Sequence, residues 1–126
     1  MNKILKIITA LPALLFIVIG LRWLLGPASV AAEFGMPLLD GLGGSTQIGD
    51  LGAFFLGCGL MILFGLVTEK REWLYAATLL LALAAVFRTA AWLLYDLPFA
   101  APQVALEVVI TVLLLFTASL DRNARE

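Results

Sequence analysis

The sequence contains no histidine and one cysteine, Cys58, which lies inside a long apolar run. Zinc sites are built mainly from cysteine and histidine, and iron–sulfur clusters are held by several cysteine thiolates. A disulfide within the chain would need a second cysteine. The sequence therefore excludes zinc fingers, iron–sulfur centres and internal disulfides, and we expect neither a metal ion nor a cofactor.

Charged residues are scarce as well, at 13% of 126 residues, and eight lysines and arginines nearly balance nine aspartates and glutamates. Without a basic patch, nucleic-acid binding is not expected. Apolar residues make up 63% of the chain, which is typical of an integral membrane protein. We therefore expect residues 1–126 to form one domain embedded in the lipid bilayer, with no separate soluble domain.

Four apolar stretches can cross a membrane as helices, because a span needs about 20 mostly apolar residues. We expect spans at about residues 4–25, 45–67, 73–95 and 100–120. The first stretch resembles a signal peptide, but it is long enough to span and is expected to remain uncleaved. Residues 27–34 predict a short interfacial helix, and the glycines and prolines in residues 35–44 predict a loop. The fold class is therefore predicted to be an all-α, four-helix antiparallel membrane bundle.

The loop charges predict the orientation of this bundle, because lysine and arginine accumulate in cytoplasmic loops. The loops predicted on the other side hold Glu33, Asp40 and Asp96 and no lysine or arginine. Both termini should therefore be cytoplasmic and residues 26–44 should face outward. Six cations agree with this orientation: Lys3, Lys6, Lys70, Arg71, Arg122 and Arg125.

Each predicted span carries one charge in what would be the outer half of the membrane: Arg22, Asp50, Arg88 and Glu107. Charges in a membrane are costly and are normally paired or turned inward. Arg88 and Glu107 lie about ten residues on either side of the turn near residue 98, and so at matching depths at about 1.5 Å per residue. Arg22 and Asp50 match in depth in the same way. We expect the pairs Arg88–Glu107 and Arg22–Asp50, although exchanged partners fit the sequence equally well.

Further residues are expected beside this charged cluster. On the fourth span, polar side chains recur every four residues and form one stripe with Glu107. Near Arg88, two aromatic residues share its helix face. An arginine fork binds carboxylates or phosphates at two points, so a small anionic or lipid-like ligand is one candidate partner. The predicted pocket lining is Gln47, Trp92, Tyr95, Gln103 and Thr111.

Small residues recur every four positions on the second span, at Gly49, Ala53 and Gly57. Small residues at this spacing let membrane helices approach closely. We expect this face to pack within the monomer. The alternative is an interface with further copies of the chain or with other subunits of a larger membrane complex.

The residues 44–55, GSTQIGDLGAFF, together with Arg88 and the later Glu107, carry a resemblance to a known family. The chain resembles a bacterial family of small four-span membrane proteins that is similar in layout to DoxX-like proteins. The resemblance covers nearly the whole chain. It implies a single four-helix domain in the bacterial inner membrane, and it assigns no activity.

Three functions are compatible with the charged cluster. The leading hypothesis is a non-enzymatic inner-membrane protein whose outward cluster binds a small or lipid-like ligand. In the second, the charges only lock helix packing and the chain is an accessory or assembly subunit. A small oligomeric transporter is the third. Catalysis is not expected, because arginine partners would keep Asp50 and Glu107 ionised and unsuited to acid–base work.

Overall fold

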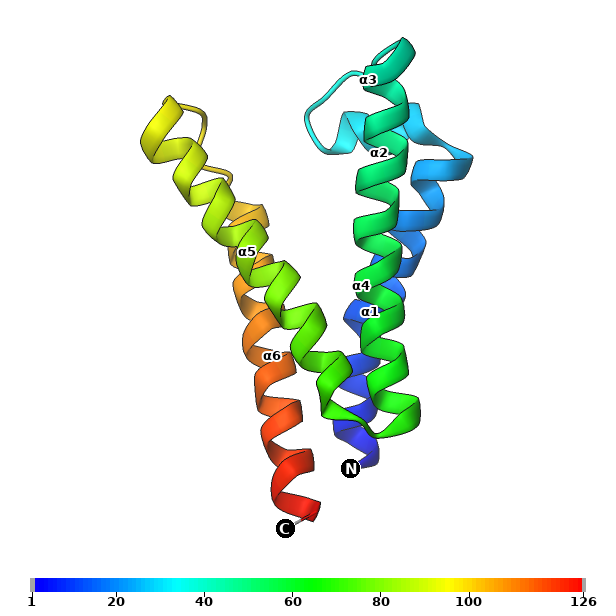
Figure 1. Ribbon diagram of the computed structural model, residues 1–126, viewed down its shortest axis with the longest axis vertical. Helices are drawn as coiled ribbons and strands as arrows, with labels where there is room; N and C mark the ends of the chain where they lie inside the picture. The colour runs from blue at the N-terminus through cyan, green and yellow to red at the C-terminus, as the bar shows by residue number, and fades with distance from the viewer. Residues whose placement is uncertain (1, 126) are drawn as a thin grey trace.

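The computed structural model describes residues 2–125, and side chains over residues 2–120, and this part of the chain is all-helical (Figure 1). Helical segments follow one another with short connections. Their bounds are α1 (Lys3–Leu25), α2 (Pro27–Glu33), α3 (Gly41–Thr46), η1 (Gln47–Leu51), α4 (Gly52–Thr68), α5 (Arg71–Tyr95) and α6 (Ala101–Arg125).

Four helices are long and apolar enough to cross a membrane, because their lengths reach the roughly 20 residues that a span needs. Three of them are α1, α5 and the part of α6 up to Leu120. The fourth is continuous from Gly41 to Thr68, because α3, one turn of π-helix (η1) and α4 follow each other without a break. The four predicted spans agree with these helices to within a few residues.

The second span starts earlier than predicted. Residues 41–44 were expected to be loop, but the helix begins at Gly41, after Asp40 in extended backbone conformation. The glycines permit this start, since Gly41 has φ +61° and a side chain at Gly44 would collide with the carbonyl oxygen of Leu39. The predicted short helix after the first span is present as α2.

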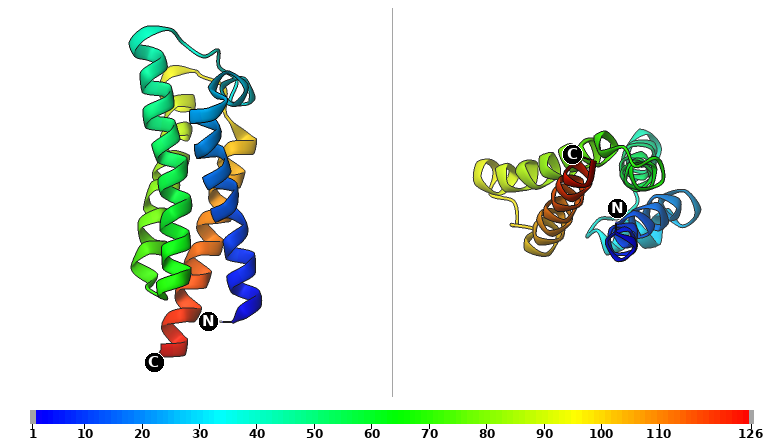
Figure 2. Two further views of the ribbon diagram at one scale, coloured as in Figure 1. Left: turned by 90° about the vertical axis from the view of Figure 1, so that its right-hand side faces the viewer. Right: turned by 90° about the horizontal axis from the view of Figure 1, so that it is seen from below.

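The long helices form two hairpin-like pairs that diverge toward one end of the molecule. Helices α1 and α4 pack along their length, and so do α5 and α6. In Figure 1 the two pairs approach each other near the chain termini and splay apart toward the α2–α3 loop and the α5–α6 turn. The end-on view in Figure 2 likewise places α5 and α6 on one side and α1 and α4 on the other. The space between the pairs holds the candidate site.

Two glycines allow the close packing of α1 against α4. A Cβ atom at Gly59 would lie 2.7 Å from the carbonyl oxygen of Ala13, and one at Gly20 would lie 2.6 Å from the backbone nitrogen of Leu56. Any larger residue would push the two helices apart, because backbone atoms cannot move aside as a flexible side chain can.

The expected packing of Gly49, Ala53 and Gly57 within the monomer is wrong. Apart from the adjoining residues and backbone of its own helix, no described atom comes within 4 Å of a Cβ built at Gly49 or Gly57, and Ala53 is exposed. Helix α4 therefore turns a different set of glycines toward α1. Which stripe of α4 packs depends on helix rotation, which the spacing of small residues does not specify.

A hydrogen bond joins the two pairs where they converge. The hydroxyl oxygens of Thr9 on α1 and Thr117 on α6 lie 2.9 Å apart, and both residues are fully buried. The Thr117 hydroxyl already donates to the carbonyl oxygen of Leu113 at 2.9 Å, so Thr9 is the donor in this contact. A core of buried apolar side chains surrounds this end, among them Ala13, Cys58, Ile62, Leu74 and Leu114.

Candidate functional site

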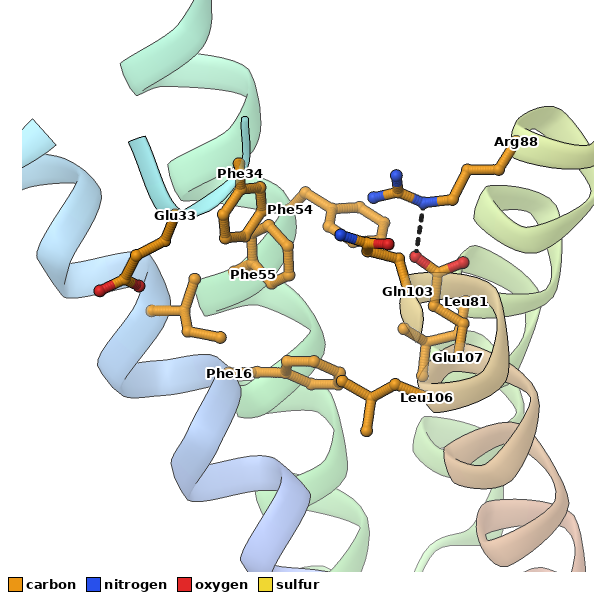
Figure 3. Close-up of a pocket in the computed structure, with 11 residues that line it drawn as sticks. Phe16, Glu33, Phe34, Phe54, Phe55, Leu81, Arg88, Gln103, Leu106 and Glu107 are labelled. Carbon is orange, nitrogen blue, oxygen red and sulfur yellow. Dashed lines mark hydrogen bonds and ion pairs between the residues drawn. The ribbon is translucent and has the colours of Figure 1, made fainter. Parts of the chain in front are cut away.

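A cavity of about 150 Å³ lies between the two helix pairs, in the half of the molecule where they splay apart. Helices α1 and α4 and the end of α2 form one wall, and α5 and α6 form the other (Figure 3). Aromatic and aliphatic side chains dominate the first wall, and the polar side chains gather on the second. The lining residues are Phe16, Ile19, Glu33, Phe34, Phe54, Phe55, Leu81, Arg88, Gln103, Leu106 and Glu107.

Arg88 and Glu107 form an ion pair at the polar end of the cavity. Arg88 Nε donates to Glu107 Oε1 at 3.0 Å, which is the pairing expected from their matching depths. The Glu107 side chain is 11% exposed and that of Arg88 is 35% exposed. Burial of an unpaired carboxylate is costly, so the arginine compensates the charge that α6 brings into the interior.

The pair leaves hydrogen-bonding capacity unused. Arg88 donates through Nε alone within the described residues, and its terminal nitrogens point toward the cavity in Figure 3. Gln103, one turn before Glu107 on α6, presents its amide at the same end. Glu107 Oε2 is buried and has no hydrogen-bond partner among the residues that the structure describes, and the same holds for Thr111 Oγ1 one turn further along α6. The polar end can therefore offer donors from Arg88 and Gln103, and an acceptor at Glu107 Oε2, to a bound molecule.

Four phenylalanines line the apolar side of the cavity, and three of them pack around Phe55. Its ring centroid lies 5.2 Å from those of Phe34 and Phe54 and 5.8 Å from that of Phe16. Edge-to-face contacts of this kind are favourable and hold the rings in defined positions. Phe34 reaches the cavity because α2 folds back over the end of α1.

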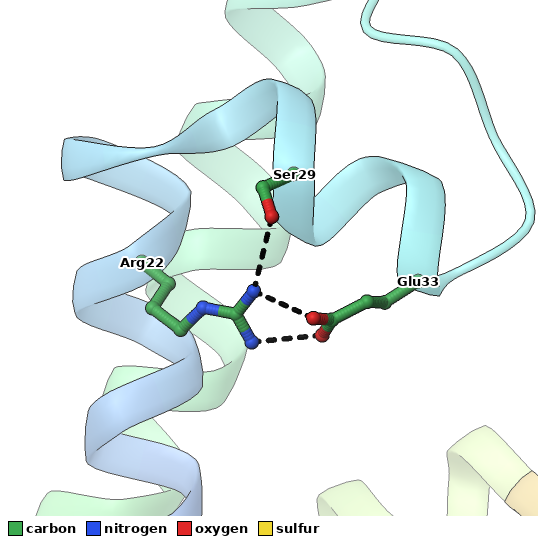
Figure 4. A network of polar contacts seen from close by, with 3 residues as sticks. All are labelled: Arg22, Ser29 and Glu33. Atoms are coloured by element: carbon green, nitrogen blue, oxygen red, sulfur yellow. Dashed lines mark hydrogen bonds and ion pairs between the residues drawn. The ribbon is translucent and has the colours of Figure 1, made fainter.

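Arg22 binds Glu33, and the predicted pair Arg22–Asp50 is wrong. Both terminal nitrogens of Arg22 lie 2.8 Å from a Glu33 carboxylate oxygen, and Nη2 is also 3.5 Å from Ser29 Oγ (Figure 4). The chain turns at Gly26 and Pro27, so α2 brings Glu33 back beside α1. The hydrogen bonds from Arg22 hold the pKa of the Glu33 carboxyl below its ordinary value. The Glu33 carboxylate points away from the cavity, so only its stem contributes to the lining.

Asp50 does not join the cavity. It lies in η1, is exposed, and has no ion-pair partner among the described residues. The rotation of η1 carries the carboxylate onto the open side of the helix, next to Gly49 and Ala53. The four predicted charges therefore do not form one cluster: Arg88 and Glu107 line the cavity, Arg22 turns to Glu33, and Asp50 stands apart.

Of the five other residues predicted to line the pocket, one lines the cavity and four do not. Gln103 lines the cavity, and Thr111 is not among the residues that do so. Gln47 is buried elsewhere: it accepts from the backbone nitrogen of Leu39 at 2.8 Å and donates to the carbonyl oxygen of Pro37 at 3.0 Å, which ties the α2–α3 loop to η1. The rings of Trp92 and Phe99 pack at a tilt with their centroids 5.0 Å apart, and Tyr95 is exposed. Neither Trp92 nor Tyr95 is among the residues that line the cavity.

Sequence reasoning missed the phenylalanines and Glu33, as well as three aliphatic lining residues, Ile19, Leu81 and Leu106. Phenylalanines in apolar runs give no signal of their own, because most such residues face lipid or the core. For Glu33 a signal existed: an acidic residue eleven positions after Arg22, separated from it by the chain reversal at Gly26 and Pro27. Among the described residues no group of three histidine, cysteine, aspartate or glutamate side chains could hold a metal ion.

Comparisons of the chain with protein-family models, with curated proteins and with solved structures gave no match.

Proposed function

We propose that this protein is a non-enzymatic membrane protein that binds a small or lipid-like molecule between its two helix pairs. The main support for the proposal is the cavity, whose two walls differ in chemistry. Phenylalanine rings line one wall, and the Arg88–Glu107 ion pair lies on the other. Ligand sites are typically concave, mostly apolar, and supplied with a few polar groups that orient the bound molecule. This cavity has that composition.

The polar end supports binding more than a purely structural role. A lock between helices needs only a closed ion pair, with all of its hydrogen-bonding capacity used inside the protein. Within the part of the chain that the structure describes, the terminal nitrogens of Arg88 have no hydrogen-bond partner, and they point toward the cavity. An amphipathic molecule could place its polar end against Arg88 and its apolar part against the phenylalanines.

Native mass spectrometry of the protein released from bacterial membranes tests this function. The wild-type protein should retain a co-purified molecule, and Arg88→Met should lose it. Arg71→Met is the matched control, because it removes the same charge at the other end of α5, far from the cavity. Equal retention by Arg88→Met and the wild type would contradict the proposal.

We further propose that the four long helices cross the bacterial inner membrane as an antiparallel bundle with both termini in the cytoplasm. The distribution of lysine and arginine between the loops supports this orientation. Single cysteines in a Cys58→Ala background test it: a membrane-impermeant maleimide added to cells should label Asp40→Cys and spare Lys70→Cys. The reverse labelling would invert the orientation.

A second candidate function is that of an accessory subunit in a larger membrane complex. The open stripe formed by Gly49 on η1 and by Ala53 and Gly57 on α4 favours it, since small residues suit close approach of another helix. In a gentle detergent, a partner should co-purify with the wild type and be lost with Gly57→Leu. Val112→Leu, at an exposed position of α6, is the control. Recovery of no stoichiometric partner with the wild type would count against this function.

A further inference from the structure

The size of the cavity limits what can enter it. Its volume is about 150 Å³, and a cavity of about that volume accommodates a benzene-sized molecule. A complete lipid is far larger, so only one end of a lipid-like molecule can be enclosed. The enclosed part is therefore about one six-membered ring in size.

The rings of the wall favour an apolar body for this enclosed part. Phe16, Phe34 and Phe54 each make a tilted or edge-to-face contact with Phe55, and all four rings line the cavity, where a flat group can pack against them. Planar apolar groups gain most in such surroundings. The hydroxyl groups of a sugar would have to leave water for a wall that offers them nothing.

The charges of Arg88 and Glu107 at the polar end determine whether the bound group should be charged or neutral. Arg88 already has a counter-ion, because Glu107 Oε1 lies 3.0 Å from its Nε, so the pair as a whole is neutral. A second anion at Arg88 would sit close to the Glu107 carboxylate and be repelled in a medium of low dielectric constant. An uncharged oxygen acceptor can take the free donors of Arg88 without this repulsion.

We infer, on the basis of the proposed binding function, that the enclosed group is an uncharged, ring-sized apolar group carrying a hydrogen-bond acceptor such as a carbonyl oxygen. The acceptor binds the terminal nitrogens of Arg88, and the ring lies among the phenylalanines. Glu107 acts as a specificity-determining residue: it neutralises Arg88 and so selects uncharged acceptors over carboxylates.

Three fluorinated probes built on the same benzene ring test the inference: 4′-fluoroacetophenone, 4-fluorobenzoate and fluorobenzene. Their binding to the full protein in lipid nanodiscs is measured by fluorine NMR against empty nanodiscs, so that partition into lipid is subtracted. The ketone should bind about tenfold more tightly than fluorobenzene, roughly the factor of one hydrogen bond to a charged group. It should also bind more tightly than the benzoate.

Two variants with the same change of charge sharpen the test. Glu107→Gln removes the counter-ion of Arg88, so the benzoate should become the tightest of the three probes. Asp50→Asn changes the net charge equally, but Asp50 lies outside the cavity lining and forms no ion pair among the described residues, so the wild-type order should persist. If Glu107→Gln fails to fold, the relative affinities of the three probes for the wild-type protein still test the inference.

Tightest binding of the benzoate by the wild type would overturn the inference and leave the proposed function standing. Equal binding of the ketone and fluorobenzene would do the same, because the acceptor would then be irrelevant. Absence of binding by all three probes would also overturn it. The proposed function would then rest on the co-purified molecule, whose detection does not depend on these probes.

Discussion

Arg22 donates hydrogen bonds to Glu33 from both terminal nitrogens, each 2.8 Å from a carboxylate oxygen. This bidentate ion pair connects α2 to the end of α1 (Figure 4). Phe34 directly follows Glu33 and packs its ring against Trp23 and Phe55 at centroid distances of 5.8 Å and 5.2 Å. The ion pair therefore holds in place the segment that supplies one wall of the cavity.

The first prediction concerns the titration of Glu33. Its carboxyl pKa should lie below the ordinary value near 4.5, because the hydrogen bonds from Arg22 favour the charged form. Carbon NMR of the Glu33 carboxyl should show this, and Arg22→Ala should return the pKa toward 4.5. Asp50→Asn is the control and should leave the pKa unchanged. If Asp50→Asn shifted the Glu33 pKa as much as Arg22→Ala does, Asp50 would have to interact with Arg22 after all.

The sign of the pH dependence follows from the lowered pKa. The stabilising effect of the pair is fully present above the ordinary carboxyl pKa and is lost as the pH falls through the lowered value in the folded protein. Hydrogen exchange of residues 27–34, corrected for intrinsic rates, should therefore accelerate only in acid. Glu33→Gln should abolish this dependence, while exchange in α5 serves as the internal reference.

The second prediction concerns the contact between α1 and α4. Gly59→Ala should lower the free energy of unfolding by about 1–3 kcal/mol, since the new methyl group collides with the backbone of Ala13 and Ile17. The methyl group of Gly57→Ala, two residues earlier, meets no described atom within 4 Å beyond the adjoining backbone of its own helix, and the change should alter stability by less than about 1 kcal/mol. Unfolding by sodium dodecyl sulfate in mixed micelles, followed by circular dichroism, measures both. A large loss with Gly57→Ala would mean that this face is also packed, as in contact with another subunit.

The third prediction concerns the hydrogen bond between Thr9 and Thr117. A double-mutant cycle with Thr9→Val and Thr117→Val should give a coupling free energy of about 0.6 kcal/mol, the average for such bonds between membrane helices. Thr78→Val is the control: its hydroxyl bonds to Leu74 within α5, so it should show no coupling to Thr9→Val. Zero coupling between Thr9 and Thr117 would mean that the convergence of the helix pairs rests on apolar packing alone.

The fourth prediction separates a structural role of Arg88 and Glu107 from a binding role. Arg88→Met alone should destabilise by about 1–3 kcal/mol, less than for a fully buried pair because Arg88 is 35% exposed. Arg88→Met combined with Glu107→Leu should restore stability to within about 1 kcal/mol of the wild type, since no charge is then left unpaired.

The doubly substituted protein should nevertheless retain no co-purified molecule in native mass spectrometry, although it is folded. If it kept the molecule, Arg88 and Glu107 would be a packing device and the binding groups would lie elsewhere. Lys6→Met combined with Glu69→Gln is the control, because it removes an ion pair between two residues that do not line the cavity.

The sequence by itself determined the four apolar helices, the short α2 and the matching depths of Arg88 and Glu107. Length of apolar runs and the positions of proline and glycine specify these features, because a helix advances by a constant rise per residue. Depth along a helix is therefore readable from residue counts alone, and the ion pair across the α5–α6 turn follows from it.

Only the tertiary structure decided the partner of Arg22, the isolation of Asp50, the open stripe at Gly49 and Gly57, and the phenylalanine wall. Each depends on the rotation of a helix about its axis and on the angle between the two helix pairs. In an apolar span almost every face is hydrophobic, so no periodicity in the sequence marks the inward side. Close packing at Gly20 and Gly59 sets the rotation, and the divergence of the helix pairs opens the cavity.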